Sequence, residues 1–335
     1  MRILFRADGN ATIGLGHVIR SLALAEIVHS VGECWMAIQE PSAAVRKLVQ
    51  HARVKLWELP AQTPTAEADY LRPLLLPTDV VVLDGYSFAT SYQQTLAASG
   101  CQLAAIDDLR AWPMAVDLII NHSPGITSSM YQVAATTRFC LGPEYSLLRP
   151  PFLANFRLPE QPAAIERVLL CFGGADPLQL TRRCLTILLA LPALREVGVL
   201  TGSANEHADS LQQLVAASTT QRRFYQSASA SEMVTLLQQY DAIICPASTI
   251  LIESLVLGKA ALTGYYALNQ QPLANYVHQH QQAHSLGSFT ALSDAALQEA
   301  LTRGLQALAH EPRQPYVQQL MPQKLQAEFA LLRQG

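Results

Sequence analysis

Residues 2–30, RILFRADGNATIGLGHVIRSLALAEIVHS, run from a short apolar stretch through a loop with two glycines into an amphipathic segment. A second succession of the same kind opens at residue 167 with RVLLCFGGADP. A β-rich run, a Gly-containing loop and a helix form the repeating unit of a parallel sheet covered by helices. Two such openings in 335 residues predict two Rossmann-like α/β domains that face each other across a cleft.

The rest of the chain continues this alternation. Apolar runs predict strands at 2–5, 34–38, 80–83, 103–106, 118–120, 138–141, 168–172, 196–200, 223–225, 242–244 and 260–263. Amphipathic segments predict helices at 21–30, 42–50, 91–99, 179–189, 208–217, 231–239, 250–257 and 316–333. The stretch 150–162, PPFLANFRLPEQP, is rich in proline, which removes backbone donors and suits a linker. We therefore expect domains at 1–152 and 163–312, with a C-terminal helix in 313–335 that packs back on the first domain.

Composition narrows the class of protein. The net charge is −3 and no run of five like charges occurs, so a nucleic-acid partner is not expected, although helix N-termini could hold a small anion. No apolar stretch approaches the roughly 20 residues of a membrane span, and the N-terminal apolar run is a strand rather than a signal peptide. The six scattered cysteines predict buried thiols in a reducing compartment. We expect a cytoplasmic monomer.

Polar residues follow four predicted strands of the first half. They are Arg6-Ala7-Asp8, Asp84-Gly85-Tyr86, Asp107-Asp108 and Asn121-His122. Each alone is an ordinary start of a loop. Because ligands of doubly wound sheets bind beyond the carboxyl ends of the strands, together they predict a binding edge.

The loop Gly14-Leu15-Gly16-His17 is the sharpest local signal. Its glycines let the backbone turn and approach a ligand, and a helix follows directly after Arg20. A histidine at a helix start can simply bond a loop carbonyl, yet an imidazole at this edge could also take a proton at neutral pH. A dinucleotide fingerprint is the alternative, with Glu40 on a ribose, but its glycines should directly follow the strand.

The second half carries candidate nucleotide-binding groups. Gly173, Gly174 and Asp176 form a turn after a strand, in which Asp176 would cap the helix and Pro177 would begin it. Ser248 and Thr249 precede a helix whose free N–H groups suit a diphosphate. Glu253, one turn later, could bind the ribose hydroxyls or be a solvated helix residue. The amide pair Asn269-Gln270 lies in a loop after Tyr265-Tyr266.

Several motifs in order resemble those of a known family. They are RADGNATIGLGHVIRSLALA, LDGYSF, AIDDL, INHS, LGPEYSLLRPPF, FGGADP, ASTILIE and ALNQ, spread over residues 2 to 290. The family is the UDP-2,4-diacetamido-2,4,6-trideoxy-β-L-altropyranose hydrolase of pseudaminic acid biosynthesis. More distantly the chain resembles the GT-B glycosyltransferase that makes lipid II.

The resemblance implies a GT-B fold and a role for each candidate residue. His17 would activate water, and Asp8, Gly14, Gly16, Arg20, Tyr86, Asp107, Asn269 and Gln270 would bind the sugar or phosphates. Gly173, Gly174, Asp176, Ser248, Thr249 and Glu253 would hold UDP. Two departures matter: the family reads STTWE near Ser248, which shifts the register of Glu253, and Ala247 replaces a usual glycine.

The expected reaction is a single inverting attack of water on the anomeric carbon of a UDP-linked amino sugar, with neither metal nor cofactor. Three alternatives stay open from the sequence. A glycosyltransferase would use the same donor site, a binding or regulatory protein would hold the nucleotide sugar without turnover, and a dehydrogenase would bind NAD.

Overall fold

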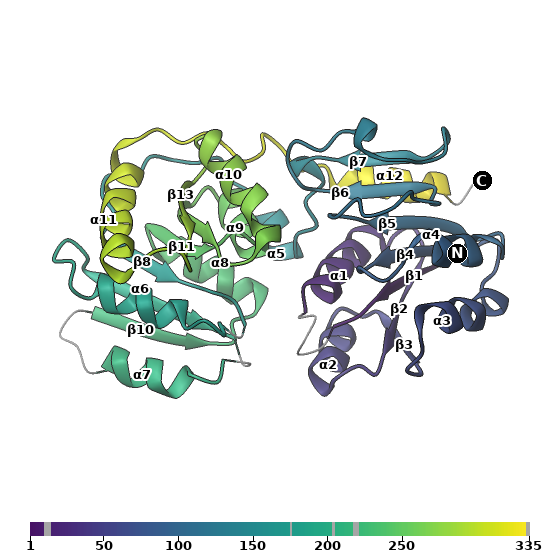
Figure 1. Ribbon diagram of the computed structural model, residues 1–335, viewed down its shortest axis with the longest axis horizontal. Coiled ribbons are helices and arrows are strands. Elements are labelled where there is room, and N and C mark those ends of the chain that lie inside the picture. Colours follow the sequence, from purple (N-terminus) through teal and green to yellow (C-terminus); the bar gives the residue numbers. More distant parts are fainter. Residues whose placement is uncertain (10–14, 175, 203–204, 217–220, 333–335) are drawn as a thin grey trace. The chain divides into compact units, whose positions relative to one another are not determined.

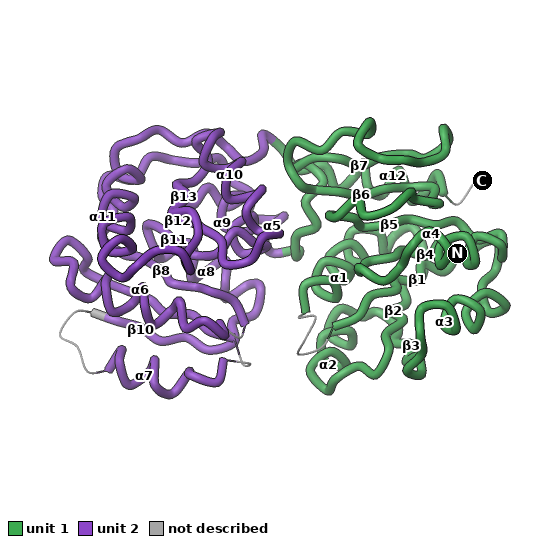
Figure 2. Tube along the Cα trace, viewed as in Figure 1, with its two compact units in different colours: residues 1–150, 319–335 green, residues 151–318 purple. Residues whose placement is uncertain are grey.

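The computed structural model describes residues 1–9, 15–174, 176–202, 205–216 and 221–332 (Figure 1). The chain divides into two compact units (Figure 2). Unit 1 comprises residues 1–150 and 319–335, and unit 2 comprises residues 151–318. Each unit is built on a parallel sheet with helices, as the alternating sequence pattern predicts.

Unit 1 contains a seven-stranded sheet in the order β3-β2-β1-β4-β5-β6-β7, and every pair is parallel. The strands are β1 (Arg2–Ala7), β2 (Glu33–Gln39), β3 (Lys55–Leu59), β4 (Val80–Asp84), β5 (Gln102–Ile106), β6 (Leu118–Asn121) and β7 (Arg138–Leu141). The helices are α1 (Gly16–Val28), α2 (Ala43–His51), α3 (Pro64–Leu71), α4 (Thr90–Ala97) and α12 (Pro322–Leu332).

The central strands of unit 1 are apolar on both faces because helices cover both. All five residues of β4, VVVLD, are buried, which is typical of a strand inside a parallel sheet. Alternate residues of the sheet, such as Leu4 and Val81, pack with α3 and α4 in one core, while α1 contacts β1 and β4. The start of α1 is therefore held directly beside the carboxyl ends of β1 and β4.

The last helix of the chain belongs to unit 1. Helix α12 contacts α1, and its residues Leu325, Phe329 and Leu332 are buried. The Gln326 amide donates to the Ile27 carbonyl at 2.7 Å. Unit 1 is thus completed by residues that follow unit 2 in the sequence.

Unit 2 contains a six-stranded sheet in the order β10-β9-β8-β11-β12-β13, again parallel throughout. The strands are β8 (Arg167–Leu170), β9 (Glu196–Thr201), β10 (Gln221–Gln226), β11 (Ala242–Pro246), β12 (Ala260–Tyr265) and β13 (His284–Ser288). The helices are α5 (Pro150–Ala154), which begins at the unit boundary, α6 (Leu180–Leu188), α7 (Ala208–Ala216), α8 (Ala230–Gln239), α9 (Thr249–Val256), α10 (Gln271–Gln279) and α11 (Asp294–His310).

The structure corrects several expectations. Strands β3 and β13 and helices α3 and α11 were not predicted, and the last helix begins at Pro322 rather than Tyr316. Helix α1 begins at Gly16, five residues before the predicted start. All six cysteines are buried and free, as predicted. Within the described ranges, no helix has the length and apolarity that crossing a membrane requires.

Candidate active site

The four strands of unit 1 that end in polar residues are neighbours in the sheet. Strands β1, β4, β5 and β6 lie side by side and parallel, so their carboxyl ends share one edge. The order of strands reverses between β1 and β4, and the crevice at such a reversal is where ligands bind doubly wound sheets. The predicted convergence of the polar strand ends is confirmed.

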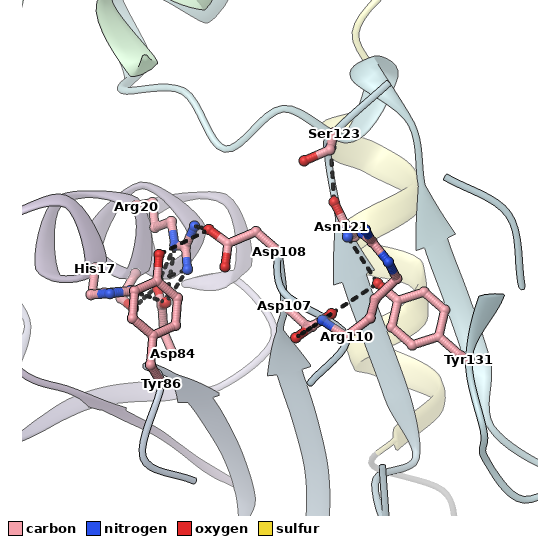
Figure 3. A network of polar contacts seen from close by, with 11 residues as sticks. His17, Arg20, Asp84, Tyr86, Asp107, Asp108, Arg110, Asn121, Ser123 and Tyr131 are labelled. Atoms are coloured by element: carbon pink, nitrogen blue, oxygen red, sulfur yellow. Dashed lines mark hydrogen bonds and ion pairs between the residues drawn. The ribbon is translucent and has the colours of Figure 1, made fainter. Parts of the chain in front are cut away.

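His17 and Asp84 form a close pair at this reversal (Figure 3). His17 is the second residue of α1, which follows β1, and Asp84 is the last residue of β4. The His17 Nδ1 lies 2.7 Å from the Asp84 Oδ1, and both side chains are buried. Adjacency of β1 and β4 brings together two residues that are 67 positions apart.

Asp84 is held by two further side chains. The Arg20 Nε donates to its carboxylate at 2.8 Å, and the Ser21 hydroxyl donates at 3.0 Å. Burial alone would raise the pKa of Asp84, but the charge of Arg20 and the hydrogen bonds from His17 and Arg20 hold it below its ordinary value. Arg20 also bonds Asp108 at 2.8 Å. Arg20 thus holds the carboxylate of Asp84 and links it to Asp108, which follows the neighbouring strand β5.

The charges around His17 fix its tautomer. An ionised Asp84 accepts only, so the His17 Nδ1 carries the proton and donates it to this carboxylate. Arg20 approaches the same nitrogen at 3.1 Å but has no lone pair to offer. In a neutral ring Nε2 is then unprotonated, which is the state of a general base.

Tyr86 lies against the ring of His17. The two rings meet edge to face with centroids 4.7 Å apart, and the Tyr86 hydroxyl lies 3.5 Å from Asp108. Tyr86 is about half exposed, and burial of the remainder, with the charge of Asp108, raises its pKa. Tyr86 therefore lies between the ring of His17 and the surface.

Asp8 and Asp107 lie at the same edge with partners of their own. The Arg6 guanidinium bonds Asp8 at 2.6 Å and the buried Glu67 at 2.7 Å, which fixes Asp8 at the end of β1. Asp107 accepts from the Arg110 backbone N–H at 3.1 Å and from the Tyr131 hydroxyl at 3.1 Å. Both carboxylates are positioned by the fold.

Of the two glycines in the His17 loop, only Gly16 can be placed, since Gly14 lies outside the described residues. Gly16 is the first residue of α1 rather than part of a turn, which corrects the expectation for it. Among the described residues, a Cβ there would meet no heavy atom within 4 Å.

The predicted residues of unit 2 lie at a second reversal of strand order, between β8 and β11. Gly173 follows β8 with φ of +89°, which only glycine adopts readily. A Cβ on Gly202, after β9, would come within 2.5 Å of the Gly174 Cα, so these two loops touch.

Asp176 caps a helix, though not as predicted. Its carboxylate accepts from the backbone N–H groups of Leu180 and Thr181 at 2.9 and 2.8 Å. Helix α6 begins only at Leu180, so Asp176 is not its N-cap and Pro177 is not its first residue. A left-handed turn at Asp176 and Gln179, with φ of 45° and 51°, separates them from the helix.

Ser248 and Thr249 stand at the carboxyl end of β11. Ser248 is the N-cap residue of α9, yet its side chain makes no capping bond, and Thr249 is exposed. Glu253 follows Thr249 by one turn on the same face of α9 and is 3% exposed. A helix N-terminus with uncommitted hydroxyls is suited to an anion.

The amide pair follows the next strand, β12, in the short helix Leu268–Gln270. Asn269 is exposed, while the Gln270 side chain accepts from the Tyr266 backbone N–H at 3.1 Å. The candidate residues after β8, β11 and β12 therefore share one edge of the second sheet.

The sequence argument did not assign roles to Asp84, Asp108 and Ser21. Asp84 and Asp108 were visible as polar strand ends, but their contact with α1 depends on the order of strands. No group of three His, Cys, Asp or Glu side chains in the described part of the chain could hold a metal ion.

Two parallel α/β units, each with polar groups where strand order reverses, define a GT-B protein. Solved structures confirm the fold. MurG of Acinetobacter baumannii matches over 100% of both chains with a TM-score of 0.62 and 14% identity. Phytolacca americana UGT2, solved with UDP-2-fluoro-glucose and pterostilbene, matches over 100% of both with a TM-score of 0.65 and 11% identity.

Two curated proteins are similar to this chain in sequence along most of its length. The chain is 22% identical over 280 residues to the UDP-2,4-diacetamido-2,4,6-trideoxy-β-L-altropyranose hydrolase of Campylobacter jejuni, across 83% of this chain and 96% of that one. It is 23% identical over 326 residues to the spore coat polysaccharide biosynthesis protein SpsG of Bacillus subtilis, across 90% and 88%. No family model matches the chain. The resemblance seen in the motifs extends over most of the sequence.

Proposed function

We propose that the chain hydrolyses a UDP-linked 2,4-diacetamido-2,4,6-trideoxy sugar to the free sugar and UDP, as a cytoplasmic step of pseudaminic acid biosynthesis. The observation that carries the proposal is the buried Asp84–His17 pair, in which His17 Nδ1 donates to Asp84 and Nε2 is the nitrogen left to act as a base. The similarity to the Campylobacter jejuni hydrolase supports the choice of substrate.

In the proposed reaction His17 takes a proton from water through Nε2. The hydroxide oxygen bonds to the anomeric carbon as the bond from that carbon to the UDP oxygen breaks, which inverts the anomeric centre. Asp84 stabilises the imidazolium that forms, because its carboxylate already accepts from Nδ1. His17 then loses the proton to solvent, and the atoms balance without a metal or cofactor.

Unit 2 supplies the nucleotide site in this proposal. Ser248, Thr249 and the N-terminus of α9 hold the diphosphate and its developing charge. Glu253 binds the ribose hydroxyls, and the turn from Gly173 to Asp176 contacts the nucleotide. Asn269 and Gln270 reach the phosphates or sugar from the neighbouring strand. The reaction requires both units to engage one substrate.

Unit 1 supplies the sugar side. Tyr86 lies against the ring of His17, and Asp8 and Asp107 stand at the same sheet edge. None of the described residues would block substrate from the N-terminus of α1 at Gly16. We propose that these residues, with Gly14 and Arg20, line the sugar.

A single incubation tests the proposal. The UDP-diacetamido sugar is mixed with the protein, without acceptor and with a chelator, in ¹⁸O-labelled water. We expect mass spectrometry to show UDP without label and a free sugar with one ¹⁸O. NMR should show that the sugar is first released with inverted configuration at its anomeric carbon. Label on UDP would mean cleavage of a P–O bond, and loss of turnover in chelator would mean a metal takes part.

A glycosyltransferase is the second candidate, because the solved structures with this fold include UDP-glucosyltransferases. It would use the same nucleotide site and a base that activates an acceptor hydroxyl. The two candidates differ in the incubation without acceptor. A transferase leaves the UDP-sugar intact there, and adding an acceptor glycan then releases UDP.

A further inference from the structure

His122 is a polar residue of the binding edge that the proposed reaction leaves without a role. It directly follows Asn121, the last residue of β6, beside the strand that ends in Asp107 and Asp108. Its flanking residues are bonded to each other, since the Asn121 side-chain Oδ1 accepts from the Ser123 backbone N–H at 2.9 Å (Figure 3). The backbone on both sides of His122 is therefore fixed.

The two ring nitrogens of His122 differ in surroundings. Nδ1 is buried and finds no hydrogen-bond partner among the described residues. The residue as a whole is only partly buried, and Nε2 is not among the buried unpartnered atoms. The Nδ1 edge of the ring thus points into the protein, and the Nε2 edge lies on the accessible side.

Burial, together with the charge of Arg20, keeps the ring of His122 neutral. Burial, and then the charge of Arg20, lower the pKa of His122 to about 4, against smaller opposing effects of Asp108 and Asp84. A neutral imidazole carries one proton. A buried N–H without an acceptor is rarer than a buried lone pair, which places the proton on Nε2.

The charged neighbours already satisfy one another. Arg20 bonds both Asp84 and Asp108. The Nε2–H of His122 is therefore a neutral donor that is free to meet a ligand at the same sheet edge as His17. Amide carbonyl oxygens are strong acceptors that cannot donate, and an acylated amino sugar carries one on each acyl group.

We propose that His122 binds the substrate, its Nε2–H donating to the carbonyl oxygen of one N-acyl group of the sugar. The inference rests on the proposed function, whose substrate class it specifies further. His122 makes the site select acylated amino sugars, because a hydroxyl analogue leaves the donor poorly paired in a partly desolvated place.

The test measures binding as well as turnover. Dissociation constants are determined by calorimetry for the UDP-diacetamido sugar and for two analogues with a hydroxyl in place of the acetamido group at C2 or C4. Wild-type His122, His122→Phe and His122→Gln are compared, each in a His17→Asn background so that the sugar is not consumed during the titration, with UDP alone as the control ligand. Phe keeps the ring without a donor, and Gln returns an N–H near the position of Nε2.

We expect His122→Phe to weaken binding of the diacetamido sugar about 10- to 100-fold. The wild-type preference over one of the two analogues should disappear, with the affinity for UDP unchanged, and His122→Gln should restore most of it. Equal weakening of all three sugars, or no change, would overturn the inference. Should His122→Phe fail to bind UDP through misfolding, His122→Asn, whose shorter side chain withdraws the donor, replaces it.

Measuring turnover distinguishes a failure of this inference from a failure of the proposed function. A wild type that binds the three sugars but hydrolyses none disproves the hydrolase, and the binding ratios still decide the role of His122. A wild type that hydrolyses the diacetamido sugar while His122→Phe keeps its preference supports the hydrolase and disproves the role of His122.

Discussion

The carboxylate of Asp84 bonds three side chains at once, His17, Arg20 and Ser21. A carboxylate with so many donors cannot rotate, and so it fixes the ring of His17 in one orientation. It also fixes which nitrogen carries the proton. The chemistry open to His17 therefore depends on a neighbour that is itself fully buried.

Two substitutions test the two members of this pair, His17 as the proposed base and Asp84 as the residue that orients it. His17→Asn removes the base and should lower kcat on the order of 10²- to 10⁴-fold with a modest change in KM. Asp84→Asn should cost about as much, because the amide N–H can donate to Nδ1 and drive the proton onto Nε2. Steady-state kinetics on the UDP-diacetamido sugar measures both.

Asp79→Asn is the matched control for Asp84→Asn. Asp79 is a buried carboxylate just before β4, at the opposite edge of the sheet, where it bonds Arg2. Its loss should lower stability and leave kcat intact. Full activity in His17→Asn, or equal losses of kcat in both aspartate variants, would argue against the pair as the catalytic unit.

His122 should make the stability of unit 1 depend on pH. Its folded pKa is about 4, below an ordinary value of about 6.5, so the unfolded chain binds more protons between these pH values. Stability therefore rises with pH through this window and is lost as pH falls, by on the order of 2 kcal/mol.

Urea unfolding between pH 4 and 7 checks this, followed by the fluorescence of Trp35, Trp57 and Trp112. All three tryptophans of the chain lie in unit 1, so the signal reports that unit. His122→Phe should show a shallower slope with pH than wild type. The same slope in both proteins would mean that another group carries the effect.

At the scale of elements, both units place functional groups where strand order reverses. In unit 1 a helix start meets the end of β4, and in unit 2 the start of α9 follows β11, beside β8. A helix that begins at such a point aims its free N–H groups at the crevice. The two elements that carry the proposed chemistry thus arise from the same rule of topology.

The hydroxyls of α9 should serve the ligand rather than the helix. Ser248→Ala and Thr249→Ala should each weaken UDP binding about 5- to 30-fold, with little loss of stability, because the Ser248 side chain makes no cap. Ser293→Ala is the control, since Ser293 does cap α11 by accepting from Ala296. It should lower the melting temperature and leave UDP binding unchanged.

Element by element, the sequence predicted the central strands and the edge strands β7 and β10, and missed the edge strands β3 and β13. Strand β3, KLWEL, is half exposed with charges at two of its five positions, and β13, HSLGS, has only one apolar residue of any size. Such strands are held by pairing with a neighbour, which no local pattern shows. Helix α11 did carry a readable signal in Leu297, Leu301, Leu305 and Leu308.

The candidate site, too, could be predicted from the sequence only in part. His17 and Asp84 could each be recognised as polar residues after a strand. Their bond could not, because it requires β1 and β4 to be neighbours, and strand order follows from the packing of the whole unit. Asp176 was misplaced as an N-cap for a related reason, since a left-handed turn moves the helix start to Leu180.

At the scale of the whole molecule, unit 1 depends on a helix from the far end of the chain. Phe329 of α12 is fully buried in unit 1, and Phe289 is equally buried in unit 2. Phe329→Ala should destabilise unit 1 by about 3–5 kcal/mol, which lowers the urea midpoint of tryptophan fluorescence.

Phe289→Ala tests whether that effect belongs to unit 1. It should destabilise unit 2 by a similar amount, seen as loss of UDP binding at lower urea, while the tryptophan transition stays in place. A tryptophan midpoint that moves equally in both variants would mean that the two units unfold as one.

The return of the chain to its first unit also sets an order of events during translation. Unit 2 has left the ribosome in full when residue 318 emerges, whereas the layer that α12 adds to unit 1 is synthesised after unit 2. The growing polypeptide thus carries a complete second half beside an unfinished first half. Premature termination near the C-terminus would therefore damage the half that holds the base, although every residue of its sheet is present.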